Sequence, residues 1–173
     1  TKAGDKVLVR SALQTDAAQI LSLAKSVIEE EVYQLTSSLE FKMTVEDEEK
    51  WIRSHLENPQ HLLLVAILND QIVGMLDFSN GRRQRIAHTG EFGMSVAKAF
   101  REKGIGSCLL SALLEWANST KTIEKINLSV HSNNERAIAL YRKMGFEIEG
   151  VRKKDLKYPD GEYIDTVIMG RLL

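Results

Sequence analysis

The stretch from Val96 to Gly106 joins an apolar, strand-like run to a long amphipathic segment, and two glycines fall where a helix would begin. The apolar residues that follow recur at the spacing of one helix face: Ile105, Cys108, Leu109, Ala112, Leu113 and Trp116. A strand that passes through a tight loop into such a helix favours a mixed α/β fold. The first amides of a helix are unpaired and lie at the positive end of its dipole. The loop therefore has two interpretations, an ordinary tight turn or a phosphate site.

The composition suits one globular domain. With 173 residues, 43% of them hydrophobic and 27% charged, the chain can build one core and is short for two, so residues 1–173 are predicted to form a single domain. The net charge of -1 gives no reason to expect nucleic acid, and the basic cluster Arg82–Arg85 is short enough to be a solvated loop. No apolar run approaches the ~20 residues that span a membrane, so no membrane partner is expected.

The single cysteine bears on compartment and chemistry. Cys108 has no partner for an internal disulfide, and the polar start Thr1–Lys6 lacks the apolar core of a signal peptide, so a cytoplasmic location is expected. Its place on an apolar helix face predicts a buried side chain rather than a nucleophile. His55, His61 and His88 show no ligand-like spacing, and we predict no metal.

Strand and helix patterns alternate along the chain without an internal repeat. Seven runs are predicted as strands: 7–10, 61–68, 71–78, 87–96, 125–131, 146–157 and 162–172. Four segments have helical periodicity: 16–28, 44–56, 105–116 and 134–144. Asp16 and Thr44 are expected N-caps, Asn69-Asp70 is expected to close a hairpin, and Gly145 is expected to end the last helix. The order predicts a mixed sheet of about seven strands with about four helices.

Two sequence motifs occur at a specific distance from each other along the chain. Arg101-x-x-Gly104-x-Gly106 is followed, one strand later, by Asn134-x-x-Ala-x-x-Leu-Tyr141-x-x-x-Gly-Phe. Together they resemble the GNAT superfamily of N-acetyltransferases, whose acetyl-CoA signature is Gln/Arg-x-x-Gly-x-Gly/Ala. The match is strong from Glu91 to Gly150, and the order of elements agrees elsewhere. The resemblance implies the GNAT fold, an α/β (α+β) architecture in which splayed central strands bind acetyl-CoA as a cosubstrate.

The resemblance also implies which residues hold the donor. Backbone amides of one loop would hold the pyrophosphate, and the loop comprises Arg101, Glu102, Lys103, Gly104, Ile105, Gly106 and Ser107. The backbone around Met94 and Val96 would pair with the pantetheine arm as an added strand does. Asn134 would touch the cofactor or orient its helix, and it is also a good N-cap, so both roles can hold. Glu102 stands where the family often has glycine, and its carboxylate could weaken cofactor binding.

Acetyl transfer to an amine needs an acid for the leaving thiol and a route for the amine's proton. Tyr141 is the candidate acid, because a phenol of pKa ~10 is protonated at neutral pH and can donate to a thiolate. An amine of pKa ~10.4 is only ~0.1% neutral at pH 7. Glu91, on the strand that leads into the loop, is the candidate base; a water chain and a merely solvated or structural Glu91 remain open.

The acceptor is less defined by the sequence. Glu29–Glu31 with Tyr33 could form an acidic and aromatic wall or a solvated face, and Tyr163 and Asp165 have the same two interpretations. His131 is expected to be hydrogen-bonded at a strand end. Our first hypothesis for the acceptor is a small primary amine such as an amino acid, a polyamine or an amine-bearing antibiotic. A protein N-terminus or lysine is the alternative; a non-catalytic CoA-sensing or partner-binding domain is the alternative of another class. A homodimer formed through the final strands is a further hypothesis.

Overall fold

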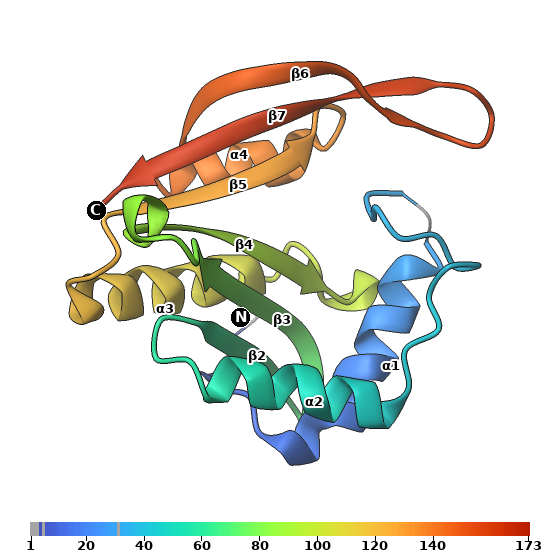
Figure 1. The fold of residues 1–173 in the computed structure, drawn as a ribbon. Helices are drawn as coiled ribbons and strands as arrows, with labels where there is room; N and C mark the ends of the chain where they lie inside the picture. The colour runs from blue at the N-terminus through green and yellow to red at the C-terminus, as the bar shows by residue number, and fades with distance from the viewer. Residues whose placement is uncertain (1–3, 5, 31) are drawn as a thin grey trace.

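A twisted seven-stranded sheet carries helices on both faces (Figure 1). The computed structural model describes residue 4 and residues 6–30 and 32–173. Within them the strands lie in the order β1 (Leu8–Ser11), β2 (Leu62–Leu68), β3 (Gln71–Asn80), β4 (Thr89–Val96), β5 (Lys125–His131), β7 (Tyr163–Leu172) and β6 (Glu147–Lys157). The α-helices are α1 (Ala17–Ile28), α2 (Val45–Leu56), α3 (Ile105–Thr120) and α4 (Glu135–Lys143). The predicted mixed sheet and four helices are confirmed.

The two central strands separate along their length. β4 and β5 are parallel and pair only from Thr89 opposite Lys125 to Glu91 opposite Asn127. On its other side β4 stays paired with β3 as far as Val96. The part of β4 after Glu91 therefore has one open edge facing β5, which is the splay expected of this fold. In Figure 1 the gap widens toward the side where the α1–α2 and β6–β7 connections lie.

Each face of the sheet has its own hydrophobic core. On one face, α3 and α4 pack on side chains such as Leu76, Phe78 and Phe92. On the other, α1 and α2 pack on Val65 and its neighbours through Ile20 and Ile52. Because side chains alternate along a strand, successive residues of β3 and β4 point into different cores. This alternation decides which strand residues can face a ligand from either side of the splay.

Most of the expected local signals form as predicted. Thr44 and Asp47 make a reciprocal capping box at the start of α2, with Asp47 N–H donating to Thr44 Oγ1 at 3.2 Å. Asn69 and Asp70 both take positive φ values, as a tight hairpin turn requires, and Gly145 has φ +83° at the end of α4. The strand expected from residue 87 begins at Thr89 instead, because Gln84–Ile86 form a 3₁₀ turn before it.

The prediction for Cys108 is wrong, because its side chain is exposed. The buried face of α3 is centred on other positions of the helix: Ile105, Leu109, Leu110, Leu113, Leu114 and Ala117. Cys108 lies at the margin of this face, where the 3.6-residue period alone does not distinguish the edge of an apolar stripe from its centre.

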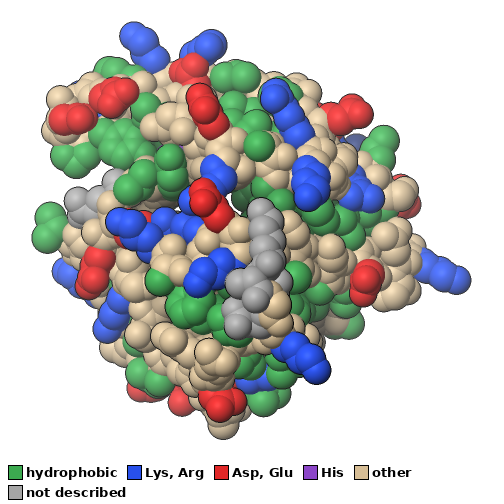
Figure 2. Space-filling model, turned by 180° about the vertical axis from the view of Figure 1, so that it is seen from behind, with side chains coloured by type: hydrophobic (Ala, Val, Ile, Leu, Met, Phe, Trp, Pro, Cys, Tyr) green, Lys and Arg blue, Asp and Glu red, His purple; other side chains and the backbone are tan. Residues whose placement is uncertain are grey.

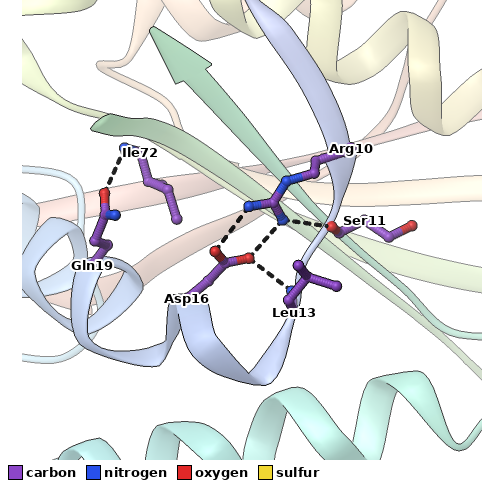
Figure 3. Close-up of polar contacts among 6 residues, drawn as sticks. All are labelled: Arg10, Ser11, Leu13, Asp16, Gln19 and Ile72. Atoms are coloured by element: carbon purple, nitrogen blue, oxygen red, sulfur yellow. Dashed lines mark hydrogen bonds and ion pairs between the residues drawn. The ribbon is translucent and has the colours of Figure 1, made fainter. Parts of the chain in front are cut away.

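Asp16 is not the side-chain N-cap of α1 that the sequence predicts. It makes no side-chain cap bond to α1. Its carboxylate instead accepts hydrogen bonds from both terminal nitrogens of Arg10, at 2.7 and 2.9 Å, and from Leu13 N–H at 2.7 Å (Figure 3). These bonds tie β1 to the turn that leads into α1, and hydrogen bonding to Arg10 is the main cause of the lowered pKa of Asp16.

We expect Arg10→Met to lower the free energy of unfolding by about 1–3 kcal/mol at neutral pH, because it leaves a nearly buried carboxylate without its cation. Since the folded pKa of Asp16 is lowered, the stabilisation is present above its unfolded pKa of ~3.9 and is lost as pH falls through the folded value. Urea unfolding at neutral and acidic pH tests this. Lys50→Met, which breaks an exposed pair with Glu46, is the control and should change little. An equal loss at both pH values would contradict the assignment.

The edge strand β6 carries exposed apolar side chains. β6 is one of the two edge strands, with β1 at the other edge; Ile148 and Val151 are exposed on β6, and two register shifts interrupt its ladder with β7. Dimerisation through the final strands stays a prediction. Lys and Arg side chains are interspersed with Asp and Glu over the face in Figure 2. No helix in the described part of the chain is both long and apolar enough to cross a membrane.

Candidate active site

The open edge of β4 offers unpaired backbone groups. Ala97 N–H donates to Val73 O at 2.9 Å, so alternate residues of β4 bond to β3 and those between them face the gap. The groups facing the gap are those of Met94 and Val96, the two residues predicted to pair with an extended ligand. The Val96 carbonyl accepts a hydrogen bond from Arg101 Nε at 2.9 Å. The N–H of Val96 and the N–H and carbonyl of Met94 are therefore free to bond to an extended ligand.

The loop after β4 turns a second set of backbone groups outward. Glu102 and Gly104 have φ values of +65° and +92°, and such alternation gathers successive N–H groups into a concavity that suits anions. Among the described residues, no backbone carbonyl accepts from the amides of Glu102 to Ser107. The Arg101 amide, which was expected to join them, donates to Lys98 O at 3.3 Å within a 3₁₀ turn. The run of free amides therefore begins one residue later than predicted.

The two glycines of the motif, Gly104 and Gly106, have different structural roles. A Cβ on Gly104 would meet nothing within 4 Å, so this residue is needed for its left-handed backbone and leaves open space before the amides. A Cβ on Gly106 would lie 3.0 Å from Leu140 Cδ2 and 3.4 Å from Met94 Cε. Gly106 therefore serves close packing of α3 against α4 and β4.

Arg101 holds the loop in place through its side chain. Its guanidinium makes two hydrogen bonds to the Glu30 carboxylate, at 2.6 and 2.7 Å, and is only 20% exposed. Glu30 is therefore occupied and does not serve as an open acidic wall. Glu31 lies outside the described residues, and Glu29 is exposed. The ion pair joins the end of α1 to the loop that follows β4.

Glu102 has a strained backbone and a solvated side chain. Its φ of +65° explains why glycine suits this position, because a left-handed conformation costs a residue with a Cβ about 1–2 kcal/mol. Its carboxylate is 76% exposed and lies 3.9 Å from Arg136 Nη1 on α4. The charge is thus partly balanced beside the free amides.

We expect Glu102→Gly to tighten acetyl-CoA binding by roughly twofold to fivefold, since it removes a negative charge beside the free amides. Glu102→Gln removes the same charge and keeps a side chain at this position, so it should tighten binding to a similar extent. Calorimetric titration at low and high salt tests this, and the charge effect should shrink as salt rises. Weaker binding to the glycine variant would contradict the assignment.

Tyr141 and Glu91 lie on opposite faces of the gap. Tyr141 is 8% exposed and packs edge-on against Phe92, with ring centroids 5.7 Å apart. Burial raises the pKa of Tyr141 to about 12. Glu91 precedes Phe92 on β4 and so points to the other face, where it is exposed and accepts a hydrogen bond from Ser129 Oγ at 2.8 Å. The two predicted catalytic side chains therefore flank the splay from either side.

Asn134 begins the helix that carries Tyr141. Its Oδ1 accepts from Ala137 N–H at 3.2 Å, which confirms the predicted N-cap. Within the described part of the chain, the Asn134 side-chain amide nitrogen donates to no protein group. The cap leaves this nitrogen available to a ligand, so contact with the cofactor stays a prediction.

Two acidic residues on the α1–α2 side were missed from the sequence. Asp77 on β3 lies opposite Gly93, with Oδ1 2.9 Å from where a Cβ on Gly93 would be, and burial raises the pKa of Asp77. Glu48 on α2 is 4% exposed, and burial raises its pKa to about 7. Signals existed for both: Asp77 interrupts the apolar run 72–78, and Glu48 lies one turn before Ile52 on the buried face of its helix.

A hydrogen bond links the α1–α2 connection to the β6–β7 connection, and the two connections lie on the same side of the molecule in Figure 1. Tyr158 Oη, at the end of β6, donates to Val32 O at 2.6 Å and lies 3.0 Å from His131 Nδ1. Because the phenol gives its proton to Val32, His131 Nδ1 is the donor in the second bond. The predicted hydrogen-bonded His131 is confirmed, and the Tyr33 ring stands edge-on to it, with centroids 6.0 Å apart.

The last two acceptor candidates are engaged elsewhere. Asp165 accepts from Lys153 Nζ and Lys154 N–H, both at 2.8 Å. The Tyr163 ring lies beneath the ammonium groups of Lys154 and Lys157, each 5.4 Å from its centroid. Both belong to the β6–β7 hairpin, and their contacts stabilise it.

Comparison with known proteins agrees with this geometry. The sequence profile of the Acetyltransferase (GNAT) family matches residues 29–146. The chain belongs to this family and is an N-acetyltransferase.

Individual relatives extend the match. The L-amino acid N-acetyltransferase AaaT of Escherichia coli (strain K12) is 33% identical over 122 residues, which cover 70% of this chain and 75% of that protein. An N-alpha-acetyltransferase of Saccharolobus solfataricus is 33% identical over 129 residues, covering 69% of this chain and 74% of the relative. The crystal structure of an acetyltransferase of the GNAT family from Streptococcus pneumoniae superposes with a TM-score of 0.93 at 28% identity, covering 97% of this chain and all of that one.

Proposed function

We propose that the protein transfers the acetyl group of acetyl-CoA to the primary amine of a small molecule by direct attack in a ternary complex. The observation that carries this proposal is the unpaired edge of β4 running into a loop of free amides at the start of α3. An extended pantetheine arm suits the edge, and a pyrophosphate suits the amides. Met94, Val96 and residues 102–107 would bind the donor, with Asn134 near it.

The proposed reaction uses groups on both faces of the gap between β4 and β5. The amine nitrogen forms a bond to the thioester carbon, the carbon–sulfur bond breaks, and the sulfur leaves as a thiolate. With a pKa of about 12 against ~8.5 for a thiol, Tyr141 stabilises that thiolate by donating a hydrogen bond rather than by full proton transfer. The Val96 N–H, on the open edge, would polarise the thioester carbonyl. The amine's proton leaves through Glu91 or a water chain.

The base can be tested separately. If Glu91 accepts the proton, Glu91→Gln should lower kcat/KM by roughly one hundredfold and remove the acidic limb of its pH profile. Ser129→Ala is the matched variant, since it removes the bond to Glu91 and keeps the carboxylate. An unchanged acidic limb in Glu91→Gln would assign the proton to a water chain instead.

The names of two relatives bear on the acceptor class. The relative from Escherichia coli is named for L-amino acids, which favours a small amine, whereas the relative from Saccharolobus solfataricus is named an N-alpha-acetyltransferase, which favours a protein N-terminus. Release of free thiol across amino acids, polyamines, aminated antibiotics and peptides would separate the two. Acetyl-CoA binding without thiol release from any acceptor would favour a CoA-sensing domain.

The exposed thiol of Cys108 affects both the assay and the proposed location. It reacts with thiol reagents, so the screen is best run with Cys108→Ser. We infer a cytoplasmic location, where a lone exposed thiol stays reduced. Full activity of the serine variant would agree with direct transfer and with the absence of an acyl-enzyme on this cysteine.

A further inference from the structure

A cavity of about 560 Å³ lies beneath the connection between α1 and α2. Its walls are largely apolar and include Phe41, Met43, Trp51 and Met75. Three carboxyl groups, those of Glu40, Asp47 and Glu48, and the side chain of Lys42 also line it. A cavity of this size accommodates a small organic molecule, and its composition suits one with a carbon chain.

Glu48 differs from the other two carboxyl groups, because Glu40 accepts hydrogen bonds from Ser37 and Asp47 accepts them from Thr44. Glu48 is 4% exposed, and within the described part of the chain its carboxyl makes no hydrogen bond or ion pair. Among those residues no side-chain oxygen is both fully enclosed and without a hydrogen bond, so the Glu48 oxygens keep some accessible surface, and the residue lines the cavity. Burial of an unpaired carboxylate is costly, and a cation within the cavity would relieve that cost.

The cavity adjoins the proposed reaction site without coinciding with it. Met75 on its floor pairs with Ser95 on β4, and Asp77 follows on the same face, opposite Gly93. The cavity floor is therefore one strand spacing, about 4.8 Å, from β4, whose open edge lies on the other side. A molecule with one end at that edge can place its other end in the cavity.

We propose that Glu48 binds a second cationic group of the acceptor, so that the preferred acceptor is a diamine or another amine with a basic end group. The inference rests on the proposed acetyl transfer and names the class of amine that it uses. The reacting nitrogen meets the thioester at the β4 edge, the apolar walls cover the carbon chain, and Glu48 pairs with the far ammonium. Trp51 also lines the cavity, and an aromatic ring there can favour a cation.

The test compares linear diamines with monoamines of equal chain length, with thiol release as the readout. The wild-type protein should prefer the diamine by roughly tenfold to one hundredfold in kcat/KM, the range expected of a hydrogen-bonded ion pair. Glu48→Gln should remove that preference while monoamine turnover stays the same. Glu49→Gln, the neighbouring residue of the same type, is the matched control and should retain it.

Urea unfolding and calorimetric titration separate a failed site from a misfolded variant. Glu48→Leu should be folded and at least as stable as the wild type in urea at mildly alkaline pH, because it removes an unpaired buried carboxylate. Calorimetric titration of the diamine in the presence of coenzyme A measures binding without turnover. Binding that depends on Glu48 but gives no thiol release would support this site and overturn the proposed function. Equal turnover of diamine and monoamine, or a preference unchanged in Glu48→Gln, would overturn the site and leave the proposed function standing.

Discussion

Gly104→Val should raise the dissociation constant for acetyl-CoA by roughly one hundredfold, the largest effect on donor binding that we expect from a single substitution. A β-branched residue does not tolerate φ +92°, so the loop must shift and the amides lose their alignment. The new side chain would also occupy the open space before the amides. Loss of one or two hydrogen bonds to a charged group gives this magnitude. Calorimetric titration with acetyl-CoA measures it without an acceptor.

Gly161 provides a matched control. It has the same φ of +92° and the same open surroundings, and it lies in the turn between β6 and β7. Gly161→Val should cost similar stability in urea unfolding, because the backbone strain is alike. It should leave acetyl-CoA binding unchanged. Equal loss of donor affinity in both variants would mean that the loop before α3 is not the pyrophosphate site.

Tyr141→Phe should lower kcat by roughly one hundredfold or more with little change in acetyl-CoA affinity. The substitution removes one hydroxyl and keeps the ring that packs against Phe92 and Phe146, so the fold is retained. Because the pKa of Tyr141 is about 12, the phenol stays protonated throughout the working range. The loss should therefore be uniform between about pH 6 and pH 10, which pH profiles of kcat test directly.

Tyr163→Phe is the matched control, because it removes a tyrosine hydroxyl away from the proposed reaction site. Tyr163 is 48% exposed on β7 and stacks with two lysines through its ring, which phenylalanine keeps. Its kcat should match that of the wild type. A Tyr141→Phe enzyme of near-normal kcat would show that the departing thiolate is stabilised by backbone groups or water.

The fold was largely predictable because its signals are local. The Thr44 capping box, the Asn69-Asp70 turn and the period of the helices depend on neighbours within a few residues. The extent of the splay was not predictable, because pairing of β4 with β5 depends on segments about 36 residues apart in sequence. Cys108 shows the same limit on a small scale, since the edge of a buried face depends on what packs against it.

Some residues of the candidate site could likewise be predicted from the sequence, and others could not. Gly104 and Tyr141 follow from motifs that are contiguous in sequence, and Met94 follows from the strand that leads into the first of them. Glu48 and Asp77 become candidates only when burial is known, because a carboxylate on an amphipathic helix or strand usually faces water. The partner of Arg101 lies 71 residues earlier, and no pattern in the sequence connects the two.

The ion pair between Arg101 and Glu30 has a consequence for redesign of this enzyme. Glu30 follows α1, at the start of the connection that roofs the cavity, while Arg101 also binds the Val96 carbonyl beside the free amides. Substitutions in this connection that admit new acceptors will therefore change the Michaelis constant for the donor whenever they disturb Glu30. Libraries that diversify residues 36–43 and keep Glu30 should yield variants in which the two substrates are tuned independently.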